Sequence, residues 1–208
     1  MFKPQFEAYW QQFSNHLSLD DTHSKALLRL LLEAYSEPQR HYHTMQHIVE
    51  CLVFFHQIRN QLNDPTAVEL AIWFHDVIYD PQAIDNEEKS AELMKQQCSQ
   101  LLENTKIQKV YKWIIATKKH SPATNQDLNY LLDIDLAILG SSKQRFAEYE
   151  QQIQQEYSWV ESTLYRVKRA EVLDHFWQMQ PLYQTEYFKD LLEKQAKHNL
   201  VNCLGQQD

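Results

Sequence analysis

Hydrophobic residues recur at helical spacing along almost the whole chain, and no segment alternates between apolar and polar residues as a strand would. Near the N-terminus the apolar positions are Phe6, Trp10, Phe13 and Leu17, which fall three or four residues apart. A second apolar stripe follows and ends before Pro38. The chain also shows no internal repeat. This pattern predicts an all-α protein.

The middle of the chain contains the most apolar segment. A helix is predicted from Thr44, a suitable N-cap, and it carries a wide apolar stripe. The dipeptide Asp64-Pro65 has the residue types of an N-cap and a first helical position. The residues that follow, up to position 79, are apolar on every helical face except at His75 and Asp76. We therefore expect a central buried helix that contains a His-Asp pair.

The rest of the chain continues the helical pattern. Asp85 and Glu88 are spaced as a capping box at the start of a polar helix, and another helix is predicted after Asn104. The later helices are predicted from Leu128 to Leu139, with Gly140 as a left-handed C-terminal cap, then beyond Ser142 as long Gln- and Glu-rich segments, and finally from Pro181 to near Leu200. We expect one domain over residues 1–208, because this length suits a single core.

Glycine is scarce, and this excludes several kinds of binding site. The 208 residues contain 2 glycines, Gly140 and Gly205, whereas average usage would give roughly fifteen. Glycine-rich phosphate loops, dinucleotide fingerprints and hairpin-rich sandwiches need glycine at fixed positions, because glycine reaches positive φ at little cost. A phosphorylated ligand would therefore have to be held by side chains or by a bound cation.

Charge and cysteine content limit the partners and the cellular compartment that we expect. The net charge of −8 argues against a broad surface for nucleic acid or for an anionic membrane. The three cysteines, Cys51, Cys98 and Cys203, have no metal-binding or disulfide-framework spacing, so we expect free thiols in a reducing compartment. The N-terminal residues lack the apolar core of a signal peptide, and no apolar run is long enough to span a bilayer. These features predict a cytoplasmic protein.

Polar residues at apolar positions are the candidates for chemistry. A buried carboxylate beside an imidazole needs compensation, either by a hydrogen bond within the His75-Asp76 pair or by a cation. His47 lies on an apolar stripe, as a core histidine or as a ligand. Asp135 lies in phase with leucines, whereas Asp133 shares its side of the helix with polar residues. Asp135 is therefore expected to face the core.

These four residues form a chemically coherent set of metal ligands. Two imidazoles and two carboxylates suit Mn²⁺, Fe²⁺, Ni²⁺ or Zn²⁺ and, less well, Mg²⁺. Successive residues of a helix point about 100° apart. His75 and Asp76 can therefore reach one ion only if it lies over the edge or the end of their helix. The remaining coordination positions would be open to water and to a phosphate oxygen.

The same residues carry a resemblance to a known family. The segments are YHTMQH at 42–47, WFHDVIYD at 73–80, DNE at 85–87 and LDIDLAILG at 132–140. Together they resemble the HD superfamily of metal-dependent phosphohydrolases and, more narrowly, a bacterial group of predicted HD phosphohydrolases, over roughly residues 38–200. The resemblance implies an HD-like helical core at about 38–140 with a helical C-terminal part at 141–200. It also implies that His47, His75, Asp76 and Asp135 are the metal ligands.

Two related families suggest further roles. The run from Tyr42 to His47 is similar to the Tyr-His-Asn-x-x-His run of cyclic nucleotide phosphodiesterases, with Thr44 in place of Asn. That similarity implies that His43 is a general acid. The run from His75 to residue 80 is similar to the His-Asp-Val-Ile-Glu-Asp run of alarmone hydrolases, with Tyr79 in place of the glutamate.

The function expected from these features is hydrolysis of a nucleotide or another phosphate ester by a metal-activated water. Asp76 or Asp135 would orient that water, and His43 would protonate the leaving oxygen. One alternative is a catalytically silent nucleotide- or metal-binding regulatory module, which the missing acidic residue at Tyr79 favours. Another is a di-iron oxygenase of the same superfamily, with His43 and His120 as additional ligands.

Weaker candidates for substrate binding are His120, Lys119, Glu87 and Arg169. Each also has a structural interpretation. Cations at the end of a helix and acidic residues at its start are favoured by the helix dipole alone. For Arg169, an exposed helix face is the preferred interpretation. The expected partner is a small phosphorylated molecule, and a homo-oligomer is compatible with the sequence.

Overall fold

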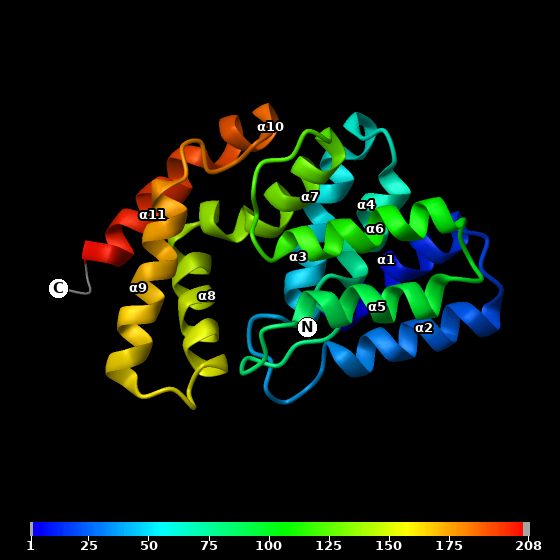
Figure 1. Cartoon of the computed structure of the whole chain (residues 1–208), viewed down its shortest axis with the longest axis horizontal. Helices are drawn as coiled ribbons and strands as arrows, with labels where there is room; N and C mark the ends of the chain where they lie inside the picture. The colour runs from blue at the N-terminus through cyan, green and yellow to red at the C-terminus, as the bar shows by residue number, and fades with distance from the viewer. Residues whose placement is uncertain (1, 206–208) are drawn as a thin grey trace. The chain divides into compact units, whose positions relative to one another are not determined.

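The computed structural model describes residues 2–205, and these residues are all-helical as predicted, with no strand (Figure 1). The chain divides into two compact units, Met1–Leu131 and Leu132–Asp208. The helices of the first unit are α1 (Lys3–His16), α2 (Asp21–Ala34), α3 (Met45–Ile58), α4 (Pro65–Phe74), α5 (Asn86–Cys98) and α6 (Asn104–Thr117), with a 3-10 turn at Arg59–Gln61. Between positions 2 and 205, no helix is long and apolar enough to cross a membrane.

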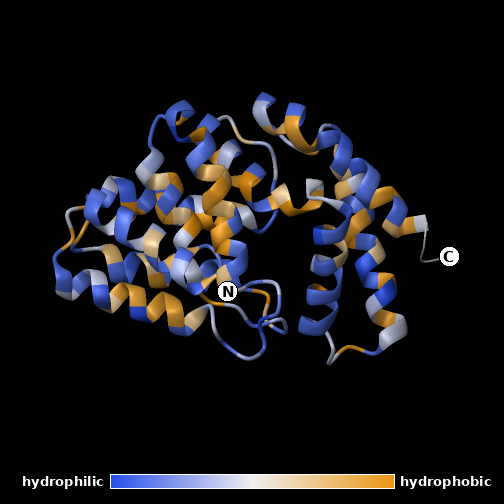
Figure 2. Ribbon diagram, turned by 180° about the vertical axis from the view of Figure 1, so that it is seen from behind, coloured by the Kyte–Doolittle hydropathy of each residue, from blue (hydrophilic) through white to orange (hydrophobic). Residues whose placement is uncertain are grey.

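The second unit is also helical, and its helix α9 has 17 residues. Helix α7 (Gln126–Asp135) begins in the first unit and ends in the second. It is followed by the 3-10 segment η2 (Leu136–Gly140), α8 (Lys143–Glu156), α9 (Ser162–Gln178), α10 (Glu186–Phe188), a π-helical turn at Lys189–Glu193 and α11 (Lys194–Gly205). Figure 2 shows apolar residues in orange along one side of several helices and polar residues in blue along the other. Amphipathic helices of this kind bury their apolar stripes against one another.

Aromatic residues form the core of the first unit. The indole of Trp73 on α4 meets two rings of α1 edge-on, with centroid distances of 4.9 Å to Phe6 and 5.3 Å to Trp10. Phe13 also faces it, at 6.5 Å. Such pairs contribute about 0.5–1.5 kcal/mol each beyond the burial of their surface. Helix α1 therefore fixes the C-terminal end of α4.

Helix α4 is shorter than its apolar sequence predicts. Asp64 caps it by accepting a hydrogen bond from the N–H of Ala67 at 3.2 Å, as expected. The expected continuation to position 79 is wrong, because the helix ends at Phe74. The carbonyls of Asp76 and Val77 accept hydrogen bonds from the side chain of Arg40, which lies in the connection before α3. These bonds hold residues 75–78 in a turn, so the His-Asp pair follows the helix end.

Two capping predictions have opposite outcomes. Thr44 caps α3 through its hydroxyl, which accepts a hydrogen bond from the N–H of Gln46 at 3.3 Å, and this confirms the prediction. The capping box at Asp85 is wrong. The Asp85 carboxylate pairs with Lys89 at 2.8 Å, and α5 has no side-chain cap there. The Thr44 cap therefore fixes the first turn of α3.

Gly140 is needed for a reason other than the predicted one. It does not have a positive φ, so the expected left-handed cap is wrong. A Cβ at this position would lie 2.6 Å from Cβ of Leu192 and 3.0 Å from the hydroxyl of Tyr183. The absence of a side chain allows η2 to approach these residues of the second unit closely.

Candidate metal centre

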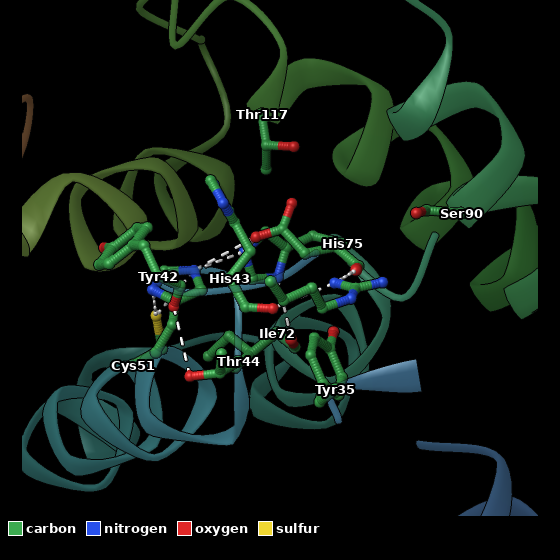
Figure 3. Close-up of polar contacts among 12 residues, drawn as sticks. Tyr35, Tyr42, His43, Thr44, Cys51, Ile72, His75, Ser90 and Thr117 are labelled. Carbon is green, nitrogen blue, oxygen red and sulfur yellow. Dashed lines mark hydrogen bonds and ion pairs between the residues drawn. The ribbon is translucent and has the colours of Figure 1, made fainter. Parts of the chain in front are cut away.

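Three side chains of the first unit converge on one point. Nε2 of His47 lies 3.1 Å from Nε2 of His75. Oδ2 of Asp76 lies 3.0 Å from Nε2 of His75 and 3.4 Å from Nε2 of His47. Both imidazoles are buried, and Asp76 is half-buried. We call these three residues the His/Asp cluster (Figure 3).

The tautomer of His75 follows from its surroundings. Its Nδ1 lies 2.9 Å from the carbonyl oxygen of Ile72, in the last turn of α4, as a dashed line in Figure 3 shows. A carbonyl only accepts, so Nδ1 carries the proton and Nε2 has a lone pair in the neutral ring. Histidines that bind metal ions are oriented by this kind of bond. The end of α4 thus aims a ligand atom of His75 at the cluster.

His47 enters the cluster from the first turn of α3. The sulfur of Cys51, one helical turn later, lies 3.7 Å from Nδ1 of His47, and the ring of Tyr42 lies 4.9 Å from the imidazole. Both neighbours are buried, as is the imidazole itself. Because Thr44 fixes the start of α3, the direction of His47 is set by the helix itself.

Asp76 is ionised in this environment. Burial alone would raise its pKa, but the charge of a protonated His75, and the hydrogen bonds that His47 and a protonated His75 donate, lower it well below its usual value. The charge of His43 contributes in the same direction. A carboxylate with this preference keeps a negative charge beside the two imidazoles across the neutral range.

The three atoms fit the coordination shell of a metal ion. Bonds of about 2.0–2.2 Å place neighbouring ligand atoms about 3.0–3.5 Å apart in octahedral or tetrahedral geometry, and the observed separations are 3.0, 3.1 and 3.4 Å. With both imidazoles neutral, a lone pair of His75 would face the carboxylate of Asp76. Either a proton on His75 or a cation removes this conflict. Two imidazoles and a carboxylate suit Mn²⁺, Fe²⁺, Ni²⁺ and Zn²⁺, so the cluster could hold a metal ion.

Relatives supply no further argument for this site. Comparisons with family models, curated proteins and solved structures find no match to the chain. Membership of the HD superfamily therefore remains a prediction from the sequence motifs. The functional argument rests on the residues and their geometry.

His43 lies beside the cluster, with its ring held by aromatic neighbours. The imidazole stacks on Tyr79 with a centroid distance of 4.1 Å and an interplanar angle of 27°. It meets Tyr42 edge-on at 4.9 Å and His47 at 6.0 Å. The tyrosine that replaces the glutamate of alarmone hydrolases thus acts here as a stacking partner. The role of His43 as an acid remains a prediction.

The weaker candidates of the first unit lie around the end of α6. Lys118 bridges to Glu88 at 2.9 Å and to Glu87 at 3.6 Å. Lys119 is exposed, and His120 has a positive φ of 49° just after the helix. Within residues 2–205, the group of side chains that could share one ion includes neither His120 nor Glu87. Substrate binding by His120, Lys119 and Glu87 remains a prediction.

Arg169 does not lie on an exposed helix face, so that interpretation is wrong. The residue is buried, and its Nε donates to Glu150 at 3.2 Å. Its Cζ lies 5.0 Å from the ring centroid of Tyr149. The guanidinium therefore joins α8 to α9 inside the second unit, which accounts for it without a ligand.

Of the two aspartates near the end of α7, Asp133 has a different environment from the predicted one. Asp133, expected on a polar side, is 1% exposed. Its carboxylate accepts hydrogen bonds from the N–H groups of Gln184 and Thr185, both at 2.8 Å. Asp135 is half-buried and is the last residue of α7. Helical phase alone therefore did not identify which aspartate is more buried.

Sequence reasoning missed Arg40. Its side chain is fully buried, and its guanidinium donates to the carbonyls of His43 and Asp76. The connection before α3 is polar, and such segments usually lie on the surface. The only local signal was Glu37, three residues earlier, which pairs with Nε of Arg40 at 2.9 Å.

Proposed function

We propose that this chain is a metal-dependent phosphohydrolase that acts on a nucleotide or another small phosphate ester. One observation carries the proposal: Nε2 of His47, Nε2 of His75 and Oδ2 of Asp76 lie within 3.0–3.4 Å of one another. If the His75-Asp76 pair were only a buried hydrogen bond, it would not need Nε2 of His47 at 3.1–3.4 Å from both residues. The arrangement is one that a divalent cation stabilises.

Asp135 is the proposed fourth ligand. The resemblance of the segment at 132–140 to the HD superfamily supports this role, and Asp135 is the last residue of α7. Four protein ligands leave room for water and a phosphate oxygen in a six-coordinate shell.

The proposed chemistry divides roles among residues of this chain. A divalent cation bound to these ligands would neutralise phosphate oxygens and lower the pKa of a bound water from 15.7 towards about 7. Asp76 or Asp135 would accept a proton of the attacking water. His43, beside His47 and half-buried, would donate a proton to the leaving oxygen.

Composition supports a cation as the phosphate-binding element. The chain has a net charge of −8 and 2 glycines, so neither a basic surface nor a glycine-rich loop can attract the phosphate. Arg169, the one arginine proposed from sequence for this role, is paired with Glu150. A metal ion would supply the missing positive charge.

The decisive experiment combines metal analysis with an assay of phosphate esters. We expect bound metal in the purified protein, turnover of at least one ester after loading with Mn²⁺, Fe²⁺, Ni²⁺ or Zn²⁺, and loss of both in His75→Ala. His16→Ala is the matched control, because His16 is exposed at the end of α1. We expect this control to retain both properties.

The outcomes also separate the alternatives. Absence of turnover with every metal, or full turnover in Asp76→Asn, would overturn the proposed hydrolase. Tight nucleotide binding without product would favour a regulatory module. Two iron ions per chain and oxygen-dependent activity would favour an oxygenase, whereas one ion per chain or activity with Mg²⁺ would argue against it.

A further inference from the structure

We propose that Arg40 is a positioning residue that holds His43 and the His75-Asp76 turn in a fixed relation. The structural part of this inference stands on contacts within the first unit. Its catalytic consequence rests on the proposed function, because His43 and Asp76 are the residues whose relative position would matter. Arg40 itself touches neither the substrate nor the ligand atoms.

The guanidinium binds main-chain carbonyls of two segments that are far apart in sequence. Nη1 donates to the carbonyl of His43 at 3.1 Å and to that of Asp76 at 2.7 Å. Nη2 donates to the carbonyl of Val77 at 3.0 Å. Nε donates to the carboxylate of Glu37 at 2.9 Å. One nitrogen, Nη1, thus links His43, two residues before α3, to Asp76, two residues after α4.

The four hydrogen bonds of Arg40 matter because its guanidinium is buried and cannot bond to water instead. The Arg40 side chain is fully buried, whereas Glu37 is partly exposed. Arginine offers five N–H donors in a plane, and four of them are used by these contacts. A lysine at this position would keep the charge but lose the planar fork. The carbonyls of Asp76 and Val77 would then receive fewer hydrogen bonds from residue 40, and the turn at residues 75–78 would be less constrained.

The ring of His43 is held through the same residue. Cζ of Arg40 lies 5.4 Å from the centroid of Tyr79 and 5.3 Å from that of Tyr35. Tyr79 stacks on His43 at 4.1 Å, and its carbonyl accepts a hydrogen bond from Gln39 at 3.2 Å. Arg40 therefore constrains both the main chain of His43 and the aromatic ring on which its imidazole lies.

This arrangement predicts a loss of alignment rather than a loss of the metal. Arg40 contacts carbonyl oxygens and aromatic rings, while His47 is held by α3 and His75 by Ile72. A displacement of about 1 Å between reacting groups lowers a rate by about 100-fold. We expect Arg40→Lys to lower kcat by about 10- to 100-fold. KM and the metal content per chain should change much less.

The test compares Arg40→Lys with Arg169→Lys, which disrupts a buried arginine-carboxylate pair in the second unit. The first readout is the NMR shift of the His43 ring protons, which stacking on Tyr79 moves upfield. We expect this shift to be reduced in Arg40→Lys and unchanged in Arg169→Lys. An unchanged His43 shift in Arg40→Lys would overturn the proposal, and this result does not depend on turnover.

The second readout is coupling to His43. In a His43→Gln background, Arg40→Lys should lower kcat by less than about threefold, because residues that act as a unit are non-additive. Equal losses in both backgrounds would overturn the catalytic part of the proposal. If the wild-type protein hydrolyses no phosphate ester while the His43 shift changes in Arg40→Lys as expected, the proposed function fails and the positioning role stands.

A second pair of variants covers the case in which Arg40→Lys does not fold. Tyr79→Leu removes the ring that stacks on His43, and Tyr79→Phe keeps it. We expect the His43 shift to be lost in the first and retained in the second. Identical shifts in the two variants would show that the stack does not hold His43 and would overturn the proposal.

Discussion

Each unit contains an aspartate with several close polar contacts, and the two environments differ in kind. Asp133, in the second unit, accepts hydrogen bonds from two main-chain N–H groups and from the hydroxyl of Thr185 at 2.6–2.8 Å. Asp76, in the first unit, faces two imidazole nitrogens that also lie 3.1 Å from each other. The first carboxylate is satisfied by three hydrogen-bond donors, two N–H groups and one hydroxyl. The second shares its space with atoms that can accept or bind a cation.

The comparison shows that burial alone does not identify a functional carboxylate. Burial raises the pKa of Asp133 to about 6, against the opposing effect of Thr185 and the N–H of Gln184. Burial also acts on Asp76, but the nearby imidazoles lower its pKa well below the usual value. The identity of the partners distinguishes a residue that joins segments of the chain from a candidate ligand.

The largest expected effect is on metal affinity. Asp76→Asn should weaken binding of the metal alone by at least about 100-fold, because loss of an outer partner already costs 10- to 100-fold. Asp133→Asn should leave the affinity within about threefold of wild type after correction for the folded fraction. Calorimetric titration with Zn²⁺ or Mn²⁺ measures both. Equal losses in the two variants would remove the distinction between the aspartates.

The next effect is on stability. Asp133→Asn should lower the free energy of unfolding by about 2–4 kcal/mol, because an amide cannot accept from all three donors and leaves buried groups unsatisfied. Asp135→Asn, two residues later, should change it by less than about 1 kcal/mol in the metal-free protein. Urea unfolding followed by circular dichroism tests this pair. A larger loss in Asp135→Asn would reverse our assignment.

A third carboxylate tests whether a raised pKa marks a functional group. Burial raises the pKa of Glu69 on α4 to about 7, although Arg59 opposes the shift. The unfolded chain releases this proton near 4.5, so stability falls as pH rises from about 4.5 to about 7. Glu69→Gln should therefore add about 1–3 kcal/mol at pH 8 and almost nothing at pH 4. Thermal unfolding at both pH values measures the difference, and no gain at pH 8 would contradict it.

The smallest expected effect concerns the cap that precedes His47. Thr44→Ala should lower stability by about 1 kcal/mol through loss of an N-cap. Asp20→Ala removes the cap of α2, whose carboxylate accepts from Thr22 and His23, and should cost a similar amount. Because α3 carries a proposed ligand, only Thr44→Ala should also weaken metal binding, by a few-fold. Equal metal affinities in the two variants would show that the cap does not position His47.

Local signals in the sequence predicted most of the helices. Apolar spacing and the caps at Thr44 and Asp64 correctly indicated where α3 and α4 begin. The end of α4 could not be predicted, because the turn that follows it is held by Arg40, which lies 36 residues before Asp76. Such long-range hydrogen bonds leave no periodic trace in the sequence.

The candidate ligands were accessible from the sequence because each is polar at an apolar position. We expected His75 and Asp76 to reach one ion only if it lay over the edge or the end of their helix. Both residues do lie just after the end of α4. The burial of Asp133 was not accessible, because its partners, Gln184 and Thr185, lie about fifty residues later. Gly140 likewise owes its role to Leu192, a neighbour in space.

The aromatic contacts of Trp73 determine how far the protein can be shortened. Phe6 and Trp10 pack edge-on against this indole, which lies two residues before His75. A fragment that starts at position 38 would contain all the segments that carry the resemblance and yet expose one side of Trp73. We therefore expect a fragment that preserves the ligand turn to need Phe6 and Trp10, which lie well upstream of the segments that suggest the chemistry.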